Sequence, residues 1–463
     1  MYNSTEQKLA EEQDEAKTFV KAANGVKYSV LADPTLVSHR SYKNHAFQSA
    51  GHATDTNGNW PQPLLCRLLL QSEFVNAKAS YIKFEVAVNT TGVFNPTVNG
   101  RAVRWNSSVL DLFHSVRLTG RDGTVMEYIE NLDTLASTIV QTTYETDYLV
   151  SGAGRLAGYS PYDPMSSADA VNYRTYIVPL KFFLGLASAE DLLPPQILDG
   201  ATLEIQLNNV NTAICRVHDD VGTSDINIAA DSATAAIRGC TLVTDSYLFD
   251  HKLHSLIQQE YEKSGIAIKY TSWTNTRQNV GESAQKLAFP ICQSSTRATK
   301  LIAKMTTTAT ETKLQSFNDQ YTSREGVYGY TSIQAHHADR SIPDRPLTQE
   351  SEIQFQWLAA FHKAHGGCTA VAREFTYHFP RKDAFVMSLD RAVGSKATSG
   401  VTVSTKWPLR LEMTVTKLKP PVNPAQFLNP LLYGTFIFQR YLDTFLEHER
   451  VVLCSTEGMR VLI

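Results

Sequence analysis

Three groups of histidines in this sequence have spacings that could serve metal binding. They are His251-x-x-His254, His336-His337 with nearby Asp339, and His362-x-x-His365 close to Cys368. A structural zinc site needs four such ligands, and a catalytic site needs three with one position left open. None of the groups supplies a complete ligand set. We therefore predict ordinary histidines, no metal site and no cofactor.

A glycine-rich run at 152–158, GAGRLAG, raises the question of dinucleotide binding. Its spacing is GxGxxxG rather than GxGxxG, the preceding TTYETDY is polar, and no βαβ unit surrounds it. We interpret it as a loop. Because GxSxG, P-loop and HExxH motifs are also missing from the sequence, we predict no catalytic residues and no enzymatic activity. Paired carboxylates for sugar hydrolysis, which need not be close in the chain, stay open.

The cysteines are far apart and form no CxxC pair. They are Cys66, Cys215, Cys240, Cys292, Cys368 and Cys454. This spacing predicts free, mostly buried thiols in a reducing compartment. The amino terminus has no basic flank and apolar core, so we expect no secretory signal and interpret the sequons at Asn3, Asn89 and Asn106 as chance. Without ~18 consecutive apolar residues, no membrane span is predicted.

The composition favours a large, self-associating protein. The chain has 463 residues, and one hydrophobic core stops growing at ~250–300, so we expect two core-forming units. Only 19% of residues are charged, while Tyr and Phe number 20 each. That balance is typical of surfaces buried against other subunits. The net charge of −3, with no block of lysines and arginines, argues against sequence-specific nucleic-acid binding.

Residues 171–210 carry the most informative pattern. It predicts a strand at 176–183, a helical turn at 187–193, a stop at Pro194-Pro195, a turn at Asp199-Gly200 and a strand at 203–208. In the last strand Leu203, Ile205 and Leu207 alternate with polar residues, which indicates one buried and one wetted face.

Further elements follow from the same patterns. Strands are predicted at 81–88, 115–118, 125–129, 238–248, 266–273, 285–292, 298–306, 326–334, 375–379, 384–389, 409–415 and 451–453. Gly120-Arg121-Asp122-Gly123 predicts a hairpin turn, and the segment from Gly25 to about Pro63 and residues 145–172 and 210–235 are expected to be polar connections. Trp273, Trp357 and Trp407 are interpreted as core or interface residues.

Helices are expected at fewer places. Residues 251–263 predict a helical connector, 348–364 give the clearest helical pattern, and 131–141 fit a short helix or an irregular crossing. Residues 4–24 form a capped helix that either docks by its apolar stripe or reaches a neighbouring subunit or an inner layer. The predicted fold is all-β: two tandem jelly-roll β-sandwiches with short helices in the connecting loops and an N-terminal helix. Its parts are the helix and arm at 1–60, a first jelly roll at 61–250, a linker helix at 251–264 and a second jelly roll at 265–463.

The order of these segments resembles the double-jelly-roll major capsid proteins of tailless double-stranded DNA viruses, of the Polinton-like virus, virophage and large algal DNA virus type. The resemblance is carried by LDLFHSVRL at 110–118 with DGTVME at 122–127, by the block at 176–208, and by FIF at 436–438, RVVL at 450–453 and TEGMRV at 456–461. None of these motifs is diagnostic alone, and their order over most of residues 60–463 gives the resemblance its weight.

The resemblance implies a structural protein of the virion. It implies homotrimeric pseudo-hexagonal capsomers that assemble into an icosahedral shell in the host cytoplasm or nucleus. The partners would be neighbouring capsomers, penton proteins and minor capsid proteins, and an internal membrane facing the N-terminal helix stays open. Two alternatives remain from the residues themselves: a carbohydrate-binding or carbohydrate-cleaving β-sandwich protein, and an intracellular scaffold protein.

Overall fold

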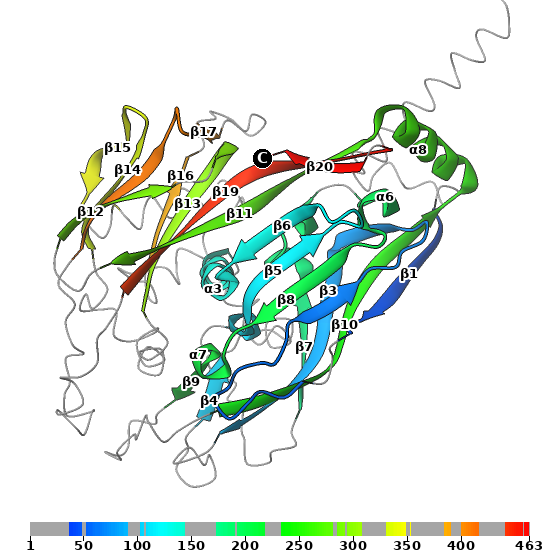
Figure 1. Cartoon of the computed structure of the whole chain (residues 1–463), viewed down its shortest axis with the longest axis horizontal. Coiled ribbons are helices and arrows are strands. Elements are labelled where there is room, and N and C mark those ends of the chain that lie inside the picture. The colour runs from blue at the N-terminus through cyan, green and yellow to red at the C-terminus, as the bar shows by residue number, and fades with distance from the viewer. Residues whose placement is uncertain are drawn as a thin grey trace, which may run out of the picture.

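The computed structural model of the chain describes residues 37–48, 52–90, 102–105, 108–143, 173–189, 192–217, 233–280, 285–291, 294–307, 330–348, 352, 384–389, 400–415, 440–456 and 458–462. These residues form two antiparallel β-sandwiches that lie side by side (Figure 1). Strands β1 to β10 build the first sandwich, and β11 to β20 build the second. The all-β prediction is confirmed.

The first sandwich packs two four-stranded sheets face to face. One sheet has the order β1 (Val37–Ala46), β10 (Ala233–Phe249), β3 (Phe74–Thr90) and β7 (Arg174–Pro179); the other has β2 (Leu64–Arg67), β8 (Thr202–Leu207), β5 (Phe113–Thr119) and β6 (Val125–Glu130). A two-stranded sheet, β4 (Ala102–Trp105) with β9 (Ile214–Val217), lies at one end. The predicted hairpin at 120–123 is confirmed, since β5 and β6 pair around it.

The second sandwich also consists of two antiparallel sheets. Its larger sheet has the order β11 (Ile266–Val280), β19 (Arg440–Ser455), β13 (Ser295–Thr307) and β16 (Ala384–Ser388), with β17 (Val401–Val403) on β13 and β20 (Gly458–Leu462) on β19; its other sheet has β12 (Gln285–Ile291), β18 (Leu409–Val415), β14 (Tyr330–His337) and β15 (Arg340–Leu347). The strand predicted at 451–453 is thus the end of a 16-residue strand, β19.

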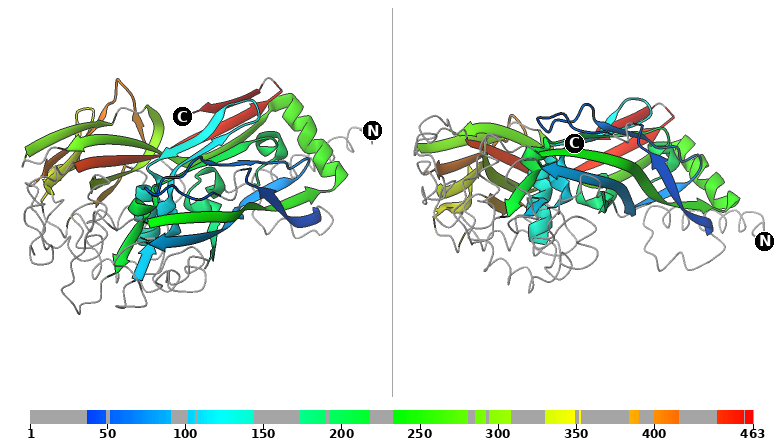
Figure 2. Two further views of the ribbon diagram at one scale, coloured as in Figure 1. Left: turned by 60° about the horizontal axis from the view of Figure 1, so that its bottom comes forward. Right: turned by 90° about the horizontal axis from the view of Figure 1, so that it is seen from below.

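Short helices cover the connections. They are α3 (Leu132–Thr143), α6 (Pro195–Leu198), α7 (Val210–Ala213) and α8 (His251–Ser264), with the 3-10 turns η1 (Val109–Leu112), η2 (Leu180–Phe182) and η3 (Leu186–Ser188). The linker helix α8 begins with Asp250 as its cap and ends at Gly265, whose φ of 72° few other residues adopt. It crosses one end of the first sandwich (Figure 2).

The polar connector expected up to Pro63 contains a strand, which corrects the prediction of an arm over 1–60. Residues 37–46 form β1, which pairs with β10 and is the edge of the first sheet. Most of its side chains are exposed, and His45 is the buried exception before the strand's last residue. Edge strands commonly carry charged side chains that discourage pairing with other chains. Because most of its residues are polar, the sequence pattern does not predict this strand.

The block at 171–210 differs from its prediction in the middle. Strand β7 ends at Pro179, so the residues up to Phe182 form η2 instead of more strand. Pro195 begins α6 rather than stopping a helix. Proline is tolerated at the first helical position because its missing N–H would have no partner there. The helical turn expected at 187–193 is only η3, and Leu193 forms a bridge with Val75.

The polar loop expected at 210–235 is also partly wrong. It opens with α7 and β9, and β10 already begins at Ala233. The predictions for residues 4–24, 145–172 and 375–379 lie outside the described residues, as does all of the helix predicted at 348–364 except Thr348 and Glu352. The alternation on β8 is confirmed, because Leu203, Ile205 and Leu207 are all buried.

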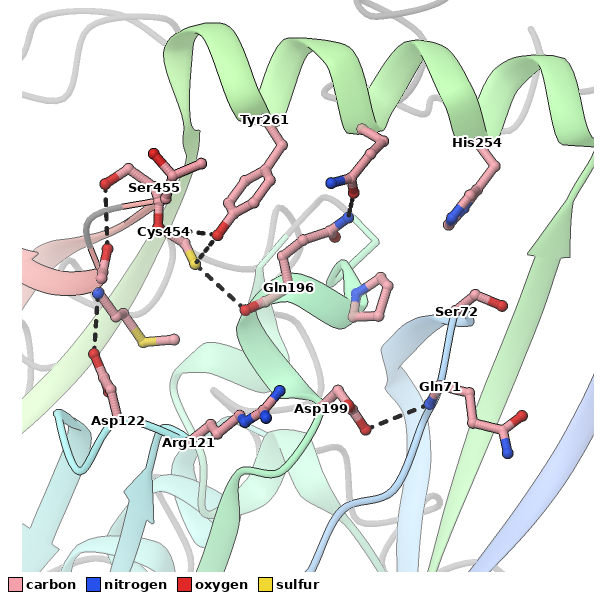
Figure 3. Close-up of a pocket in the computed structure, with 15 residues that line it drawn as sticks. Gln71, Ser72, Arg121, Asp122, Gln196, Asp199, His254, Tyr261, Cys454 and Ser455 are labelled. Carbon is pink, nitrogen blue, oxygen red and sulfur yellow. Dashed lines mark hydrogen bonds between the residues drawn. The ribbon is translucent and has the colours of Figure 1, made fainter.

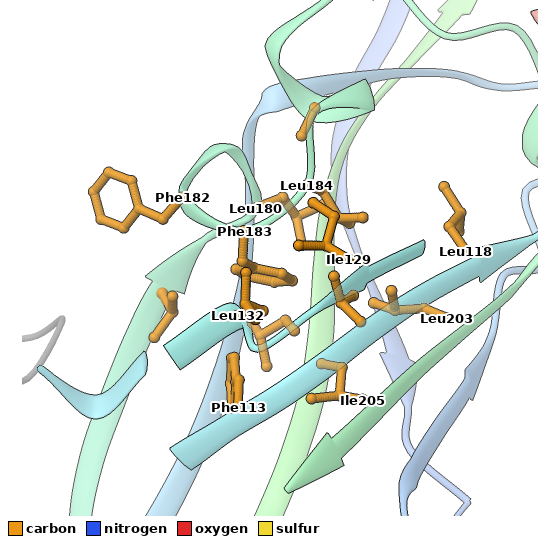
Figure 4. Packing of buried hydrophobic residues seen from close by; sticks show 14 of the residues in the cluster. Phe113, Leu118, Ile129, Leu132, Leu180, Phe182, Phe183, Leu184, Leu203 and Ile205 are labelled. Carbon is orange, nitrogen blue, oxygen red and sulfur yellow. The ribbon is translucent and has the colours of Figure 1, made fainter. Parts of the chain in front are cut away.

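The core of the first sandwich fills the space between its sheets (Figure 4). Phe84 on β3 and Phe113 on β5 come from facing sheets, with ring centroids 5.9 Å apart. Phe113 also meets the edge of Phe183, which follows η2, at 5.6 Å. The segment at 180–189 therefore closes one side of this core, as Figure 4 shows for Leu180, Phe183 and Leu184.

The second sandwich has its own core, yet its larger sheet contributes to both. One face of that sheet places Leu301 and Leu446 against β12, β14 and β18. The other face places Tyr270, Phe445 and Val452 in the core of the first sandwich. A sheet with apolar residues on both faces lies between two layers. The two sandwiches therefore form one continuous packed body.

Candidate functional site

Three of the histidines singled out in the sequence have polar partners, whereas Nδ1 of His254 is buried without a hydrogen-bond partner among the described residues. His251 Nδ1 lies 3.4 Å from Ser255 Oγ, His336 Nδ1 lies 3.0 Å from Ser341 Oγ, and His337 Nε2 lies 2.8 Å from the carbonyl of Thr402. Within the described part of the chain, no three His, Cys, Asp or Glu side chains gather as metal ligands. The glycine run at 152–158 and the group at 362–368 lie outside the described residues.

The described cysteines behave as the sequence predicted. Cys66, Cys240 and Cys454 are free and buried. Burial raises the pKa of the Cys66 thiol to about 12, and it raises that of Cys240 as well. Thiols of this kind are unreactive at neutral pH because the thiolate is the nucleophile. The backbone of Cys215 lies on β9, while Cys292 and Cys368 lie outside the described residues.

Two tryptophans can be placed. Trp273 on β11 is buried in the core shared by the two sandwiches. Trp407, on the turn before β18, is 45% exposed, so it is not a core residue of this chain. Trp357 lies outside the described residues. No helix in the described ranges is long and apolar enough to cross a membrane.

A cavity of about 590 Å³ lies beneath α8, where the two sandwiches meet (Figure 3). Its walls come from α8, α6, the β5–β6 hairpin and the β19–β20 turn. Polar contacts tie these walls together: Gln196 Nε2 donates to Gln258 Oε1 at 3.1 Å, and the Met459 N–H donates to Asp122 at 3.0 Å. The cavity thus marks a place where segments distant in sequence are fastened to one another.

Cys454 and His254 line this cavity and could suggest a thiol nucleophile with its base. The geometry argues otherwise. The Cys454 thiol lies 3.3 Å from the carbonyl of Gln196, and burial raises its pKa. Figure 3 shows the His254 ring on the far side of Gln196 from the sulfur. The thiol is therefore protonated, and none of the described residues beside it acts as its base.

The most connected polar region is the seam between the sandwiches, which we define as the contact of β6 and η3 with β11 and β19. Glu127 on β6 is fully buried and accepts hydrogen bonds from the N–H groups of Gly185 at 2.9 Å and Leu186 at 3.0 Å and from the Ser272 hydroxyl. Burial raises the pKa of this carboxyl. The carboxyl thus joins three strands or turns of the two sandwiches.

Polar side chains on β11 and β19 complete the seam. Arg450 Nη1 donates to the carbonyl of Met126 at 3.4 Å, and the Tyr270 hydroxyl donates to the same carbonyl. Further along β11, Asn131 Nδ2 donates to Asn275 Oδ1 at 2.9 Å. Buried polar groups of this kind need their partners, because an unpaired one costs ~1–3 kcal/mol. The seam therefore holds the sandwiches in one relative orientation.

Sequence reasoning missed the seam, because it read strand charges as solvent-facing. Arg277 Nε and Nη2 bind the two carboxylate oxygens of Asp443 at 2.8 and 2.9 Å, and the Asp443 side chain is completely buried. Asp133 on α3 acts electrostatically on the same guanidinium. Both charges lie outside the strands expected at 266–273 and 451–453 and inside the longer strands β11 and β19, so the sequence pattern gave no signal for them.

No protein-family model matches this chain, and no curated protein sequence does either. Solved structures do resemble it. VP54 of PBCV-1, fitted into a reconstruction of the virophage Sputnik, aligns with a TM-score of 0.57 at 11% identity, over 92% of this chain and 97% of that one. The Faustovirus major capsid protein aligns with a TM-score of 0.53 at 9% identity, over 96% and 98%. A chain of the Sputnik virophage aligns with a TM-score of 0.53 at 11% identity, over 92% and 89%.

These alignments define the fold class. They run through both sandwiches and nearly the whole length of both chains. The chain therefore has the double-jelly-roll fold found in capsid proteins of double-stranded DNA viruses, which confirms the fold expected from the sequence. The Faustovirus neighbour is a capsid protein and not an enzyme.

Proposed function

We propose that this chain is the major capsid protein of a double-stranded DNA virus, forming homotrimeric pseudo-hexagonal capsomers that assemble into an icosahedral shell. The observation that carries the proposal is the pair of side-by-side jelly rolls, whose fold matches the Faustovirus major capsid protein over 96% of this chain. A capsid protein contributes its shape to the shell, so the proposed function requires no catalytic residue, metal or cofactor.

The geometry supports this role physically. Two similar sandwiches in each chain give six similar lobes in a trimer, and six lobes tile a near-hexagonal lattice. A three-fold ring needs one heterologous contact repeated around its axis. The lobes can keep that shape only if the sandwiches of a chain do not rotate against each other. The buried contacts of Glu127 and Arg450 across the seam oppose such rotation.

The two ends of the molecule differ in the length of the connections between their strands. At the α8 end the strands are joined by short turns, such as Gly120–Thr124 and the turn before Gly458. At the other end Thr90, Ala233 and Arg440 border longer connections at 91–101, 218–232 and 416–439. Long connections tolerate insertion and often carry recognition. We assign this end to the outside of the shell and the α8 end, where β1 begins, to the inside.

Domain limits, partners and location belong to the same proposal. The first jelly roll spans 61–250 together with β1, residues 251–264 are the linker, and the second jelly roll spans 265–463. Residues before Val37 face inward, toward minor capsid proteins or an internal membrane, and penton proteins close the vertices. The protein is assembled in the host cell and resides in the virion.

Mass measurement of the purified full chain tests the proposal. Native mass spectrometry should give about three times the chain mass of 51.5 kDa, and negative-stain images should show six-lobed particles about a three-fold axis. A chain that stays monomeric at high concentration contradicts the proposal. A monomer that also binds glycans on an array favours the carbohydrate-binding alternative instead.

A further inference from the structure

A buried histidine lies in the seam between the two sandwiches. His448 on β19 is 0% exposed. Its Nε2 lies 2.9 Å from Arg450 Nε, and its Nδ1 lies 3.2 Å from the carbonyl of Leu446. Arginine can only donate, so Nε2 must accept, and the single ring proton sits on Nδ1. This hydrogen-bond pattern requires a neutral imidazole.

Each element packed around the ring contributes to its surroundings. The residues around the ring are Arg450 and Glu447 from β19 itself, Tyr270 and Ser272 from β11, Glu127 from β6 through Ser272, and Ala298 opposite the ring on β13. On the other face of β19, Lys300 binds Glu447, and Lys269 and Arg297 bind Glu449. The nearest charge to the ring is therefore a cation, the Arg450 guanidinium.

A second proton on His448 cannot be accommodated in this arrangement. It would occupy Nε2, so two N–H groups would face each other where one hydrogen bond exists. It would also place a second positive charge beside a guanidinium that is itself 7% exposed. Arg450 reaches across the seam to the carbonyl of Met126 on β6, so any displacement of Arg450 acts on the contact between the sandwiches.

We propose that His448 makes the seam acid-sensitive: protonation of its ring displaces Arg450, breaks its contact with β6 and opens the seam between β19 and β6. The two states differ in the polar contacts of the seam, where Arg450 on β19 reaches β6 and Ser272 on β11 reaches Glu127. The inference concerns the single chain and does not depend on the proposed capsid function.

The direction of the effect follows from linkage. Burial and the neighbouring Arg450 lower the pKa of His448 to about 4, from an ordinary value of 6.5. The opened seam therefore binds the proton more readily than the closed one, and the closed seam loses stability as the pH falls from about 6.5 to about 4. Protonation of Glu127 has the opposite effect on the stability of the closed seam. Burial raises the pKa of this carboxyl, so acid favours the closed form. Comparison with a His448 variant separates the two contributions.

Hydrogen exchange of the full-length protein tests the proposal. The Gly185 and Leu186 amides donate to Glu127 inside the seam and report its opening. After correction for intrinsic rates, their exchange should rise about 30-fold from pH 7.5 to pH 5 in the wild type. The rise should be absent in His448→Gln, whose amide oxygen can still accept from Arg450. The exposed His39 gives a matched control, and His39→Gln should respond like the wild type.

Two results would overturn the proposal. One is a wild type whose seam amides do not respond to pH, and the other is a His448→Gln protein with an undiminished response. If that variant does not fold, exchange of the imidazole C2 hydrogen, followed by mass spectrometry, measures the ring directly in the wild type. A pKa below 5 for His448 supports the proposal, and a value near 6.5 refutes it.

Discussion

The guanidinium of Arg277 on β11 donates two hydrogen bonds, of 2.8 and 2.9 Å, to the carboxylate of Asp443 on β19. The arginine side chain is 39% exposed, while the aspartate side chain is completely buried. The pair links the two long strands that pack against the first sandwich. A buried carboxylate is tolerated only when a cation and hydrogen bonds compensate it.

Removing the cation from this pair should therefore destabilise the protein. Arg277→Met keeps most of the aliphatic side chain but leaves Asp443 buried near Asp133 without its guanidinium. We expect the free energy of unfolding to fall by about 3 kcal/mol, measured by urea denaturation at pH 7. Lys286→Met is the control, because Lys286 is 72% exposed in its pair with Glu412 and should cost less than about 1 kcal/mol. Equal losses in both variants would mean that Asp443 is not desolvated.

Gly185 marks a close approach of the two sandwiches. A Cβ placed on it would lie 2.0 Å from the backbone oxygen of Thr271 and 2.6 Å from Glu127 Oε1. Its φ of −65° suits any residue, so the constraint is space alone. Gly185→Ala should lower the free energy of unfolding by about 3 kcal/mol, since the backbone of β11 cannot move without breaking its ladder.

Gly239 provides the opposite case and serves as the control. Its φ is 61°, and nothing lies within 4 Å of an added Cβ. Gly239→Ala should therefore cost only about 1 kcal/mol, from backbone strain. If Gly185→Ala were as mild in the same denaturation experiment, the contact between η3 and β11 would have to be looser than described.

The sequence could predict those elements whose residues alternate cleanly. Leu203, Ile205 and Leu207 face one core, so period-2 alternation was enough to find β8. Strand β6 breaks this rule, because the successive residues Met126 and Glu127 are both buried. Its outer face is covered by β11 from the second sandwich, and a local pattern cannot reveal a partner 145 residues away.

The buried charges were missed for the same physical reason. In a strand, an aspartate, histidine or arginine normally indicates the wet face. Asp443, His448 and Arg450 instead face the first sandwich, where hydrogen bonds satisfy them. Only the tertiary contact decides whether such a residue is solvated or buried. The candidate site could therefore be found only in the structure, whereas the fold could be predicted from the sequence.

The centre of β8 offers a test of the first core. Ile205 is 0% exposed and lies opposite Val116 and Leu64 on the neighbouring strands. Ile205→Asp replaces ~1.5–3 kcal/mol of apolar burial with an unpaired buried carboxylate. We expect insoluble or unfolded protein, judged by circular dichroism. The adjacent Gln206 is exposed on the other face, so Gln206→Asp should fold normally; a soluble, folded Ile205→Asp protein would contradict the assignment of β8.

The thiol of Cys66 reports on the contact between the two sheets of the first sandwich. It lies on β2 beside the Phe47 bridge, its sulfur is 3.6 Å from the carbonyl of His45, and burial raises its pKa to about 12. At pH 8 the thiolate fraction is then roughly 10³-fold below that of a free cysteine, before any steric protection.

Labelling with iodoacetamide, followed by mass spectrometry of the peptide, should be complete within minutes in urea and undetectable in the native protein over the same time. Because the thiolate is the reactive form, native labelling should remain suppressed up to alkaline pH. Rapid labelling at pH 8 without urea would show instead that the junction of β1 and β2 opens in the native state.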